Sequence, residues 1–269
     1  MRNKEVQRET FQEGFCKTNH ISVHYTRTGG NKPPIVLLHG LAANGLCWKI
    51  IARALADRYD VIMPDARGHG KSSAPARGYT YENLKDDVLG FLAAMNLTNV
   101  VLAGHSMGGL TAAMAACRSP FIRAVVLADP TFLSSERQQE VWESDAADRH
   151  REMLSLSLTE LIAERKKAHP DRSDELNGLF AAARLQTSIN AFEILKPPNP
   201  EYRQIIKEIK CPCLLLYGDR GILNDGQADE LRRINPLVTA VEIKNAGHGI
   251  FADQPRQFAE NLIQFIDAL

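Results

Sequence analysis

The stretch VLAGHSMGGL, residues 101–110, has the pattern of a buried strand, a Gly-x-Ser-x-Gly turn and the start of a helix. Such a turn holds its central residue at strained backbone angles, and side chains two residues away on either side would collide. Gly104 and Gly108 occupy those two places around Ser106. The strain lifts the serine hydroxyl out of the sheet edge. Ser106 is therefore a candidate nucleophile.

The rest of the chain alternates between strand and helix patterns. Apolar runs at 35–38, 61–63, 100–103, 124–128 and 213–217, with a more alternating run at 239–243, suit strands of a largely buried sheet. Helical periodicity appears at 48–55, 84–95 and 258–269. This alternation predicts an α/β fold with a mostly parallel sheet. Residues 20–26 alternate between apolar and polar and predict an antiparallel strand at the sheet's edge.

Residues 130–210 interrupt this rhythm because they contain no convincing strand and have the pattern of several polar helices. An insertion between two strands is a candidate lid over a site at the carboxyl edge of the sheet. We therefore expect a first part of the core at 1–129, a helical lid at 130–210 and a second part of the core at 211–269.

Composition narrows the function classes. Lys plus Arg and Asp plus Glu both total 32, which argues against a nucleic-acid binder and leaves a small molecule as the expected partner. Residues 1–15 lack the apolar core of a signal peptide, and no apolar run reaches the roughly 18 residues of a membrane span. We expect a soluble, cytoplasmic protein with no membrane partner. The sequence does not indicate its oligomeric state.

The cysteines match no disulfide framework or zinc pattern, so we expect structural thiols in a reducing compartment and no metal site. They are Cys16, Cys47, Cys117, Cys211 and Cys213.

Ser106 needs a base to take its proton. His248, in KNAGHGIF, follows the last predicted strand and precedes the last helix, so it should lie on a loop at the same sheet edge. His39 and His69 are interpreted as structural, and His105 should point away from Ser106. The remaining four histidines lie in edge or polar helical contexts and are expected to be exposed: His20, His24, His150 and His169.

Two backbone N–H groups are candidates to stabilise an oxyanion. Met107 would stand at the N-terminus of the helix after Ser106, where a developing negative charge is favoured. Leu41 lies in the loop after the strand of IVLLHG, close to where a second donor is needed.

Four segments together resemble the α/β-hydrolase superfamily: LLHGLAANG (37–45), DARGHGKS (65–72), GHSMGG (104–109) and NAGHGIFADQP (245–255). The resemblance covers nearly the whole chain. It implies the α/β-hydrolase fold, with a mostly parallel central sheet flanked by helices and a helical lid inserted after the sixth strand. It also implies structural roles for Asp65 and Arg67.

The orienting acid departs from the usual family pattern. Most members carry it after the next-to-last strand, as the second acid of Gly-Asp-x-Asp, but YGDRGIL places Gly221 there. The family's second solution is an acid that ends the strand after the nucleophile helix, and AVVLADP supplies Asp129. We favour Asp129 over the alternative, Asp219, whose family position is usually structural and whose side chain should tie down its own turn.

The acid after the sixth strand, together with the glycine-rich turn and NAGH, resembles the N-formylmaleamate deformylases. That resemblance implies a serine hydrolase of small acyl or formyl amides that needs no metal or organic cofactor. A lactonase or carboxylesterase, a ligand receptor with vestigial hydrolysis, and non-hydrolytic chemistry on this fold remain alternatives. A carboxylate-bearing substrate would suit lid arginines that face inward, and the candidates are Arg137, Arg149 and Arg184.

Overall fold

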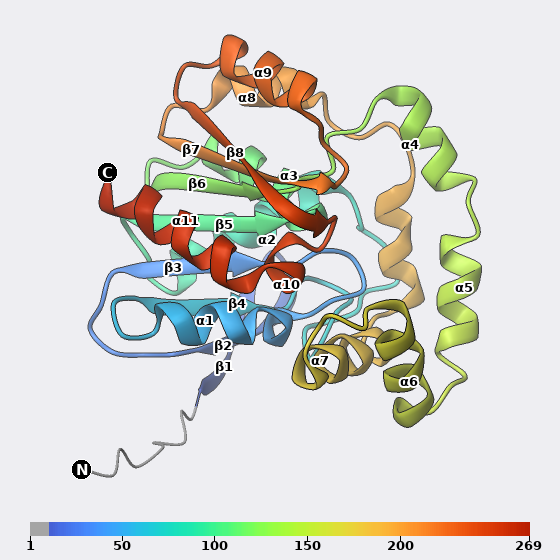
Figure 1. The fold of residues 1–269 in the computed structure, drawn as a ribbon. Helices are drawn as coiled ribbons and strands as arrows, with labels where there is room; N and C mark the ends of the chain where they lie inside the picture. The colour runs from blue at the N-terminus through green and yellow to red at the C-terminus, as the bar shows by residue number, and fades with distance from the viewer. Residues whose placement is uncertain (1–10) are drawn as a thin grey trace, which may run out of the picture.

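The computed structural model describes residues 11–269 and contains an eight-stranded sheet in the order β1-β2-β4-β3-β5-β6-β7-β8 (Figure 1). Residues 1–10, which include most of the stretch predicted not to be a signal peptide, lie outside the described residues. The strands are β1 (Gln12–Thr18), β2 (Ile21–Arg27), β3 (Pro34–Leu38), β4 (Asp60–Pro64), β5 (Val100–His105), β6 (Ile122–Ala128), β7 (Cys213–Arg220) and β8 (Val238–Gly247).

Helices cover both faces of this sheet (Figure 1). The core helices are the 3-10 helix η1 (Gly45–Trp48), α1 (Lys49–Leu55), α2 (Tyr81–Ala94), α3 (Met107–Ala116), α9 (Asp225–Ile234), α10 (Ile250–Asp253) and α11 (Pro255–Asp267). Between β6 and β7 lie α4 (Ser135–Trp142), α5 (Ala146–Met153), α6 (Leu158–Ala168), α7 (Asp174–Leu185), the 3-10 helix η2 (Ile189–Leu195) and α8 (Tyr202–Glu208).

The sheet is mostly parallel, as predicted. Strands β4, β3, β5, β6, β7 and β8 pair in parallel, and only β1 with β2 and β2 with β4 are antiparallel. Residues 20–26 coincide with the antiparallel strand β2, as predicted, but this strand is not the outermost one, because β1 pairs along its outer side. The sequence of β1, QEGFCKT, is polar and mostly exposed, so it carries no apolar signal of a strand.

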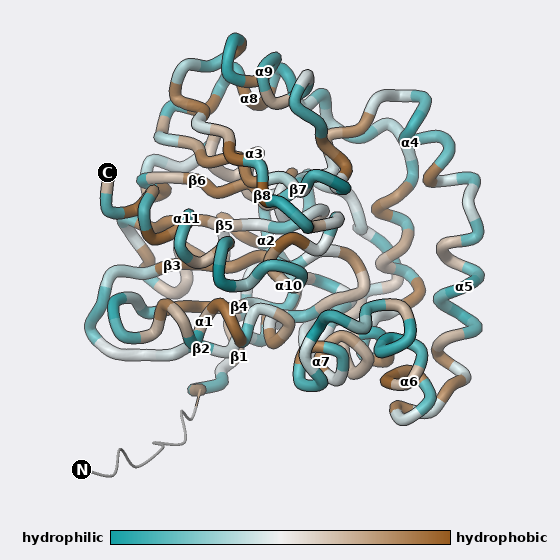
Figure 2. The backbone as a smooth tube through the Cα atoms, in the orientation of Figure 1, coloured by the Kyte–Doolittle hydropathy of each residue, from teal (hydrophilic) through white to brown (hydrophobic). Residues whose placement is uncertain are grey.

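The continuous apolar runs of the central strands result from burial on both faces. Along β5, Val100 and Leu102 pack in one core with α2, α3, α8 and α9, whereas Val101 and Ala103 pack in the other with α1, α10 and α11. Figure 2 shows hydrophobic residues concentrated in these strands, while α4 and α5 are largely hydrophilic. Complete burial of a Val or Leu side chain stabilises the fold by about 1.5–3 kcal/mol.

The segment between β6 and β7 stands beside one end of the sheet (Figure 1). Its described residues contain helices and no strand. Helices α6 and α7 pack against each other, and α5 contacts both α7 and η2. In contrast, α8 packs on α3 and α9, so the last helix of residues 130–210 belongs to the helical layer of the core.

Candidate active site

Ser106 occupies a strained turn between β5 and α3. Its backbone has φ +54° and ψ −118°, outside the regions where non-glycine residues usually lie. A Cβ on Gly104 would lie 2.0 Å from the carbonyl oxygen of Gly108, and one on Gly108 would lie 2.5 Å from that of Leu38. Both glycines are therefore required for the close approach that the sequence predicted.

His248 lies between β8 and α10 and joins Ser106 to Asp129 through its two ring nitrogens. Its Nε2 is 2.9 Å from Ser106 Oγ, and its Nδ1 is 2.7 Å from Asp129 Oδ2. Since an ionised carboxylate only accepts hydrogen bonds, Nδ1 carries the proton, and Nε2 of the neutral ring is left to accept one from the hydroxyl. This arrangement can draw the proton away from Ser106.

Asp129 directly follows β6 and is completely buried. Its backbone adopts φ +42°, which turns the carboxyl group toward the loop after β7. There Ile222 N–H donates to Oδ2 at 2.9 Å, and Leu223 N–H donates to Oδ1 at 3.3 Å. These backbone donors, with His248, compensate a carboxylate charge that would be costly to bury alone.

Gly221 is the position at which the family resemblance led us to look for the acid. A Cβ on Gly221 would lie 2.7 Å from Asp129 Oδ1 and 2.8 Å from Oδ2. The carboxyl group of Asp129 thus occupies the space that a side chain at position 221 would fill. The glycine after β7 and the aspartate after β6 therefore go together, because the carboxyl group of Asp129 fits only when position 221 has no side chain.

Asp219, the alternative acid, binds backbone instead. Its two carboxylate oxygens accept hydrogen bonds from Asn245 N–H and Ala246 N–H, each at 2.9 Å, and these bonds lower its pKa. Among residues 11–269, no hydrogen bond or ion pair joins Asp219 to His248. The expectation that Asp219 ties down its own turn was wrong, because it fastens the end of β8.

The two candidate oxyanion donors both line a cavity beside Ser106. Met107 is the first residue of α3, so its N–H has no acceptor within the helix. Leu41 follows β3 in the loop that borders the same cavity. Both residues therefore border the cavity that also contains Ser106.

Two cavities meet at Ser106 and His248. The first, of about 810 Å³, extends along α4 and α5 toward Phe192 and Asn199. The second, of about 720 Å³, extends toward α6, α7 and the loop that carries His248. Both are bordered by Leu41, Ala42, Ser106, Arg184 and His248.

A family model described as the alpha/beta hydrolase family matches residues 35–261, which span both cavities and the hydrogen-bonded Ser106, His248 and Asp129. The chain belongs to the alpha/beta hydrolase family. This membership agrees with the fold expected from the sequence.

Several relatives of this chain are named as enzymes. The N-formylmaleamate deformylase of Pseudomonas putida is 26% identical over 94% of this chain and 96% of its own. The sn-1-specific diacylglycerol lipase ABHD11 of Mus musculus is 27% identical over 87% of this chain and 81% of its own. An enol-lactonase structure from Burkholderia xenovorans is 25% identical over 94% of this chain and 100% of its own, with a TM-score of 0.77. The chain is accordingly an enzyme of the hydrolase class.

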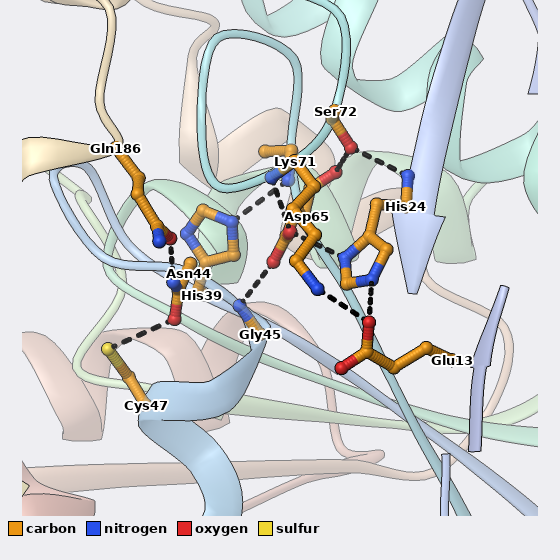
Figure 3. Close-up of polar contacts among 11 residues, drawn as sticks. Glu13, His24, His39, Asn44, Gly45, Cys47, Asp65, Lys71, Ser72 and Gln186 are labelled. Atoms are coloured by element: carbon orange, nitrogen blue, oxygen red, sulfur yellow. Dashed lines mark hydrogen bonds and ion pairs between the residues drawn. The ribbon is translucent and has the colours of Figure 1, made fainter. Parts of the chain in front are cut away.

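Asp65 organises the hydrolase's loops next to the site (Figure 3). It accepts hydrogen bonds from Gly45 N–H at 2.8 Å and Lys71 N–H at 2.9 Å, and its Oδ2 lies 2.8 Å from His24 Nδ1. Burial opposes the charge of Asp65, but His24 and these N–H groups hold its pKa below the usual value. Asp65 therefore fixes the loop that follows Leu41, a structural role like the one expected.

Arg67 also has structural contacts. Its guanidinium forms two hydrogen bonds of 2.6 Å with the carboxylate of Asp87 on α2, and both side chains are buried. Its Nη1 donates to Gly78 O at 2.6 Å. Arg67 thereby fastens the loop after β4 to α2.

Two histidines that we expected on the surface are buried. His24 is 3% exposed and lies between Asp65 and Glu13, and His150 is 0% exposed with Nε2 3.0 Å from Thr187 O. Sequence context was misleading because these polar partners come from other parts of the chain. His20 is exposed, and His169 is partly buried.

Three further histidines support the site without contacting the Ser106 hydroxyl in any described hydrogen bond. His39 Nδ1 donates to Gly40 O at 2.8 Å, its Nε2 accepts from Ala66 N–H, and His69 Nε2 accepts from Ala42 N–H. His105 was missed as a supporting residue. Its Nε2–H donates to the backbone carbonyl of His248 at 2.8 Å, which holds the loop of the catalytic candidate in place.

Within the part of the chain that the structure describes, no group of three His, Cys, Asp or Glu side chains is placed to hold a metal ion. No helix in residues 11–269 is long and apolar enough to cross a bilayer. All five cysteines are free thiols, and burial raises the pKa of Cys47 to about 12, which keeps it protonated and unreactive.

Proposed function

We propose that the protein is a serine hydrolase that cleaves a small-molecule amide, such as a formyl amide, or an ester. The observation that carries this proposal is the unbroken set of hydrogen bonds from Asp129 through His248 to Ser106, beside two cavities. The relationship to a protein named N-formylmaleamate deformylase supports an amide. The likeness to an enol-lactonase makes esters and lactones the substrates to compare with it.

Catalysis would begin when Ser106 Oγ attacks the substrate carbonyl carbon and His248 Nε2 takes the hydroxyl proton. Asp129 would hold the imidazole tautomer and stabilise the imidazolium. The N–H groups of Leu41 and Met107 would stabilise the oxyanion. Collapse of this intermediate expels the amine or alcohol, which receives the proton from His248, and leaves an acyl group on Ser106. Water, activated by His248, then releases the acid.

The helices between β6 and β7 would act as a lid that controls access to Ser106. Side chains from α4 and α5 line the first cavity, among them Arg137, Val141 and Met153. A substrate must therefore pass between this helical segment and the carboxyl edge of the sheet.

Labelling with a fluorophosphonate tests the proposed nucleophile without knowledge of the substrate. We expect one adduct, located on Ser106 by peptide mass spectrometry, because His248 activates this hydroxyl in a cavity open to the probe. Ser134→Ala is the matched control, since Ser134 lines the same cavity but caps α4 by accepting from Arg137 N–H. The control should label like the natural protein, and Ser106→Ala should not label.

Labelling on another residue would overturn the role of Ser106. So would hydrolysis of formyl amides, esters or lactones by a protein that does not label. If Ser106 labels but none of these substrates turns over above a Ser106→Ala background, the chain is a receptor with vestigial reactivity and the proposed function is wrong.

Gly221→Ala should slow fluorophosphonate labelling by about 10²-fold, since a misplacement of about 1 Å in a catalytic group has this order of effect. The new Cβ would meet the carboxylate of Asp129 at 2.7 Å and displace it from His248. The control is Gly178→Ala on α7, where an added Cβ meets nothing within 4 Å. Equal labelling rates for two folded variants would contradict the proposed packing of Asp129.

A further inference from the structure

Arg184 of α7 borders both cavities at Ser106, and among residues 11–269 no ion pair joins it to an acidic side chain. Its Nη1 lies 3.5 Å from Nδ1 of His150, whose Nε2 is 3.0 Å from Thr187 O. If Nε2 donates to this carbonyl, Nδ1 accepts from the guanidinium. Burial lowers the pKa of His150, so the ring that holds Arg184 is neutral.

Arg165 of α6 borders the second cavity from the same side. Its guanidinium carbon lies 4.7 Å from the ring centroid of Phe180, and its buried Nε has no hydrogen-bond partner among residues 11–269. Burial, followed by the charges of Arg172 and Arg184, lowers its pKa to about 10. Arg165 thus faces an apolar ring and like charges.

The other two arginines around this cavity each lie near an acidic side chain. Arg172 pairs with Asp253 at 2.8 Å, and the same carboxylate accepts a hydrogen bond from Gly247 N–H. Arg220 is 71% exposed and lies 3.8 Å from Asp219. Asp171 also borders the cavity, but within the described residues no carboxylate forms an ion pair with Arg165 or Arg184.

Two of the three lid arginines named from the sequence differ from Arg184, because each forms an ion pair with an acidic side chain. Arg137 pairs with Glu140 at 2.6 Å, and Arg149 pairs with Asp145 at 2.9 Å; both line the first cavity, but their side chains are largely exposed. Only Arg184 among them combines partial burial with the lack of an acidic partner. Arg165 was not predicted, because the sequence does not tell which face of α6 lies over the site.

Partly buried cations without counter-charges are costly, and this cost is removed when an anion binds between them. Guanidinium groups match the planar geometry of a carboxylate and can each donate two hydrogen bonds to it. We propose that Arg165 and Arg184 bind a carboxylate of the substrate in the second cavity, while the scissile carbonyl lies at Ser106. This assignment rests on the proposed hydrolase function and names its substrate class.

A pair of chromogenic esters tests the assignment: the mono-p-nitrophenyl ester of succinic acid, and p-nitrophenyl butyrate as its uncharged counterpart. The natural protein should prefer the charged ester in kcat/KM by at least about 10²-fold, in line with the cost of leaving a partner of a buried charge unpaired. Arg165→Gln and Arg184→Gln should each reduce this preference about 10-fold or more, mainly through KM.

Arg137→Gln is the matched control, because Arg137 lines the first cavity but is exposed and paired. It should keep the preference of the natural protein. Arg184→Lys should recover part of the preference lost in Arg184→Gln. A thermal melt restricts the comparison to folded variants. Equal rates on the two esters, or equal losses on both in the glutamine variants, would overturn the carboxylate site.

Binding of succinate to Ser106→Ala, measured by calorimetry, separates this proposal from the proposed reaction. Succinate should bind, and Arg165→Gln in the same background should weaken it about 10-fold or more. If neither ester is hydrolysed and succinate still binds in this way, the hydrolytic proposal fails and the anion site stands. If inorganic phosphate binds and succinate does not, the assignment to a carboxylate is wrong.

Discussion

Ser106→Ala is expected to lower kcat by about 10⁶-fold, the order of loss seen when the nucleophile of a serine hydrolase is removed. The methyl group cannot form the acyl intermediate, and His248 loses the hydroxyl that lies 2.9 Å from its Nε2. The measurement is single-turnover and steady-state hydrolysis of the best substrate found among formyl amides, esters and lactones.

The fold should survive this substitution. Alanine keeps a Cβ at φ +54°, so the backbone strain of the turn is unchanged, and the hydroxyl makes no N-cap hydrogen bond to α3. The melting temperature should therefore stay close to that of the natural protein. Residual turnover within about 10²-fold of the natural rate would be far above what the oxyanion donors alone can supply, and would exclude Ser106 as the nucleophile.

Asp129→Asn is expected to lower kcat by about 10⁴-fold, because the wrong imidazole tautomer then faces the serine. The NH₂ group of asparagine donates hydrogen bonds, so only one of the two side-chain atoms that replace the carboxylate oxygens can still accept them. In the natural chain Oδ2 of Asp129 accepts hydrogen bonds from His248 Nδ1 and Ile222 N–H, and Oδ1 accepts one from Leu223 N–H. Some loss of stability should accompany the loss of rate.

Asp219→Asn is the matched control for this second substitution. Its carboxylate accepts hydrogen bonds from Asn245 N–H and Ala246 N–H at the end of β8 and lies 3.8 Å from Arg220, and none of these described contacts involves His248. We expect a lower melting temperature and a much smaller loss of turnover per folded molecule. Should Asp219→Asn abolish turnover while Asp129→Asn leaves it nearly unchanged, the acid has been assigned to the wrong strand.

Strands β3, β4, β5, β6 and β7 were predictable because each contains an unbroken apolar run. Those runs appear where a strand is buried on both faces, as in VVLA before Ser106. Strand β1 could not be found this way, since one side of it is the sheet edge and its residues are mostly exposed. Strand β1 is held in the sheet by backbone hydrogen bonds to β2, and its side-chain sequence gives no sign of this pairing.

The site was predictable where local geometry forces a residue type. Gly104 and Gly108 mark the turn, whereas Asp129 was chosen because the family resemblance implies an acid at position 221, where this sequence has glycine. The burial of His150 and the position of Arg165 were not predictable, because their partners, Thr187 and Phe180, lie on later segments. Tertiary packing decides which side of a polar helix faces a cavity. When charged residues surround the whole helix, its sequence contains no apolar stripe that would mark the buried side.

The contact between Gly221 and the carboxyl group of Asp129 also constrains how such a chain could have arisen. A side chain at position 221 and a carboxylate in the present position of Asp129 exclude each other in space. In an ancestor with an acidic residue at position 221, that residue would have had to become glycine before, or together with, the appearance of Asp129. An acid after β7 is therefore not needed to place a carboxylate at His248, since Asp129 supplies it from the end of the neighbouring strand β6.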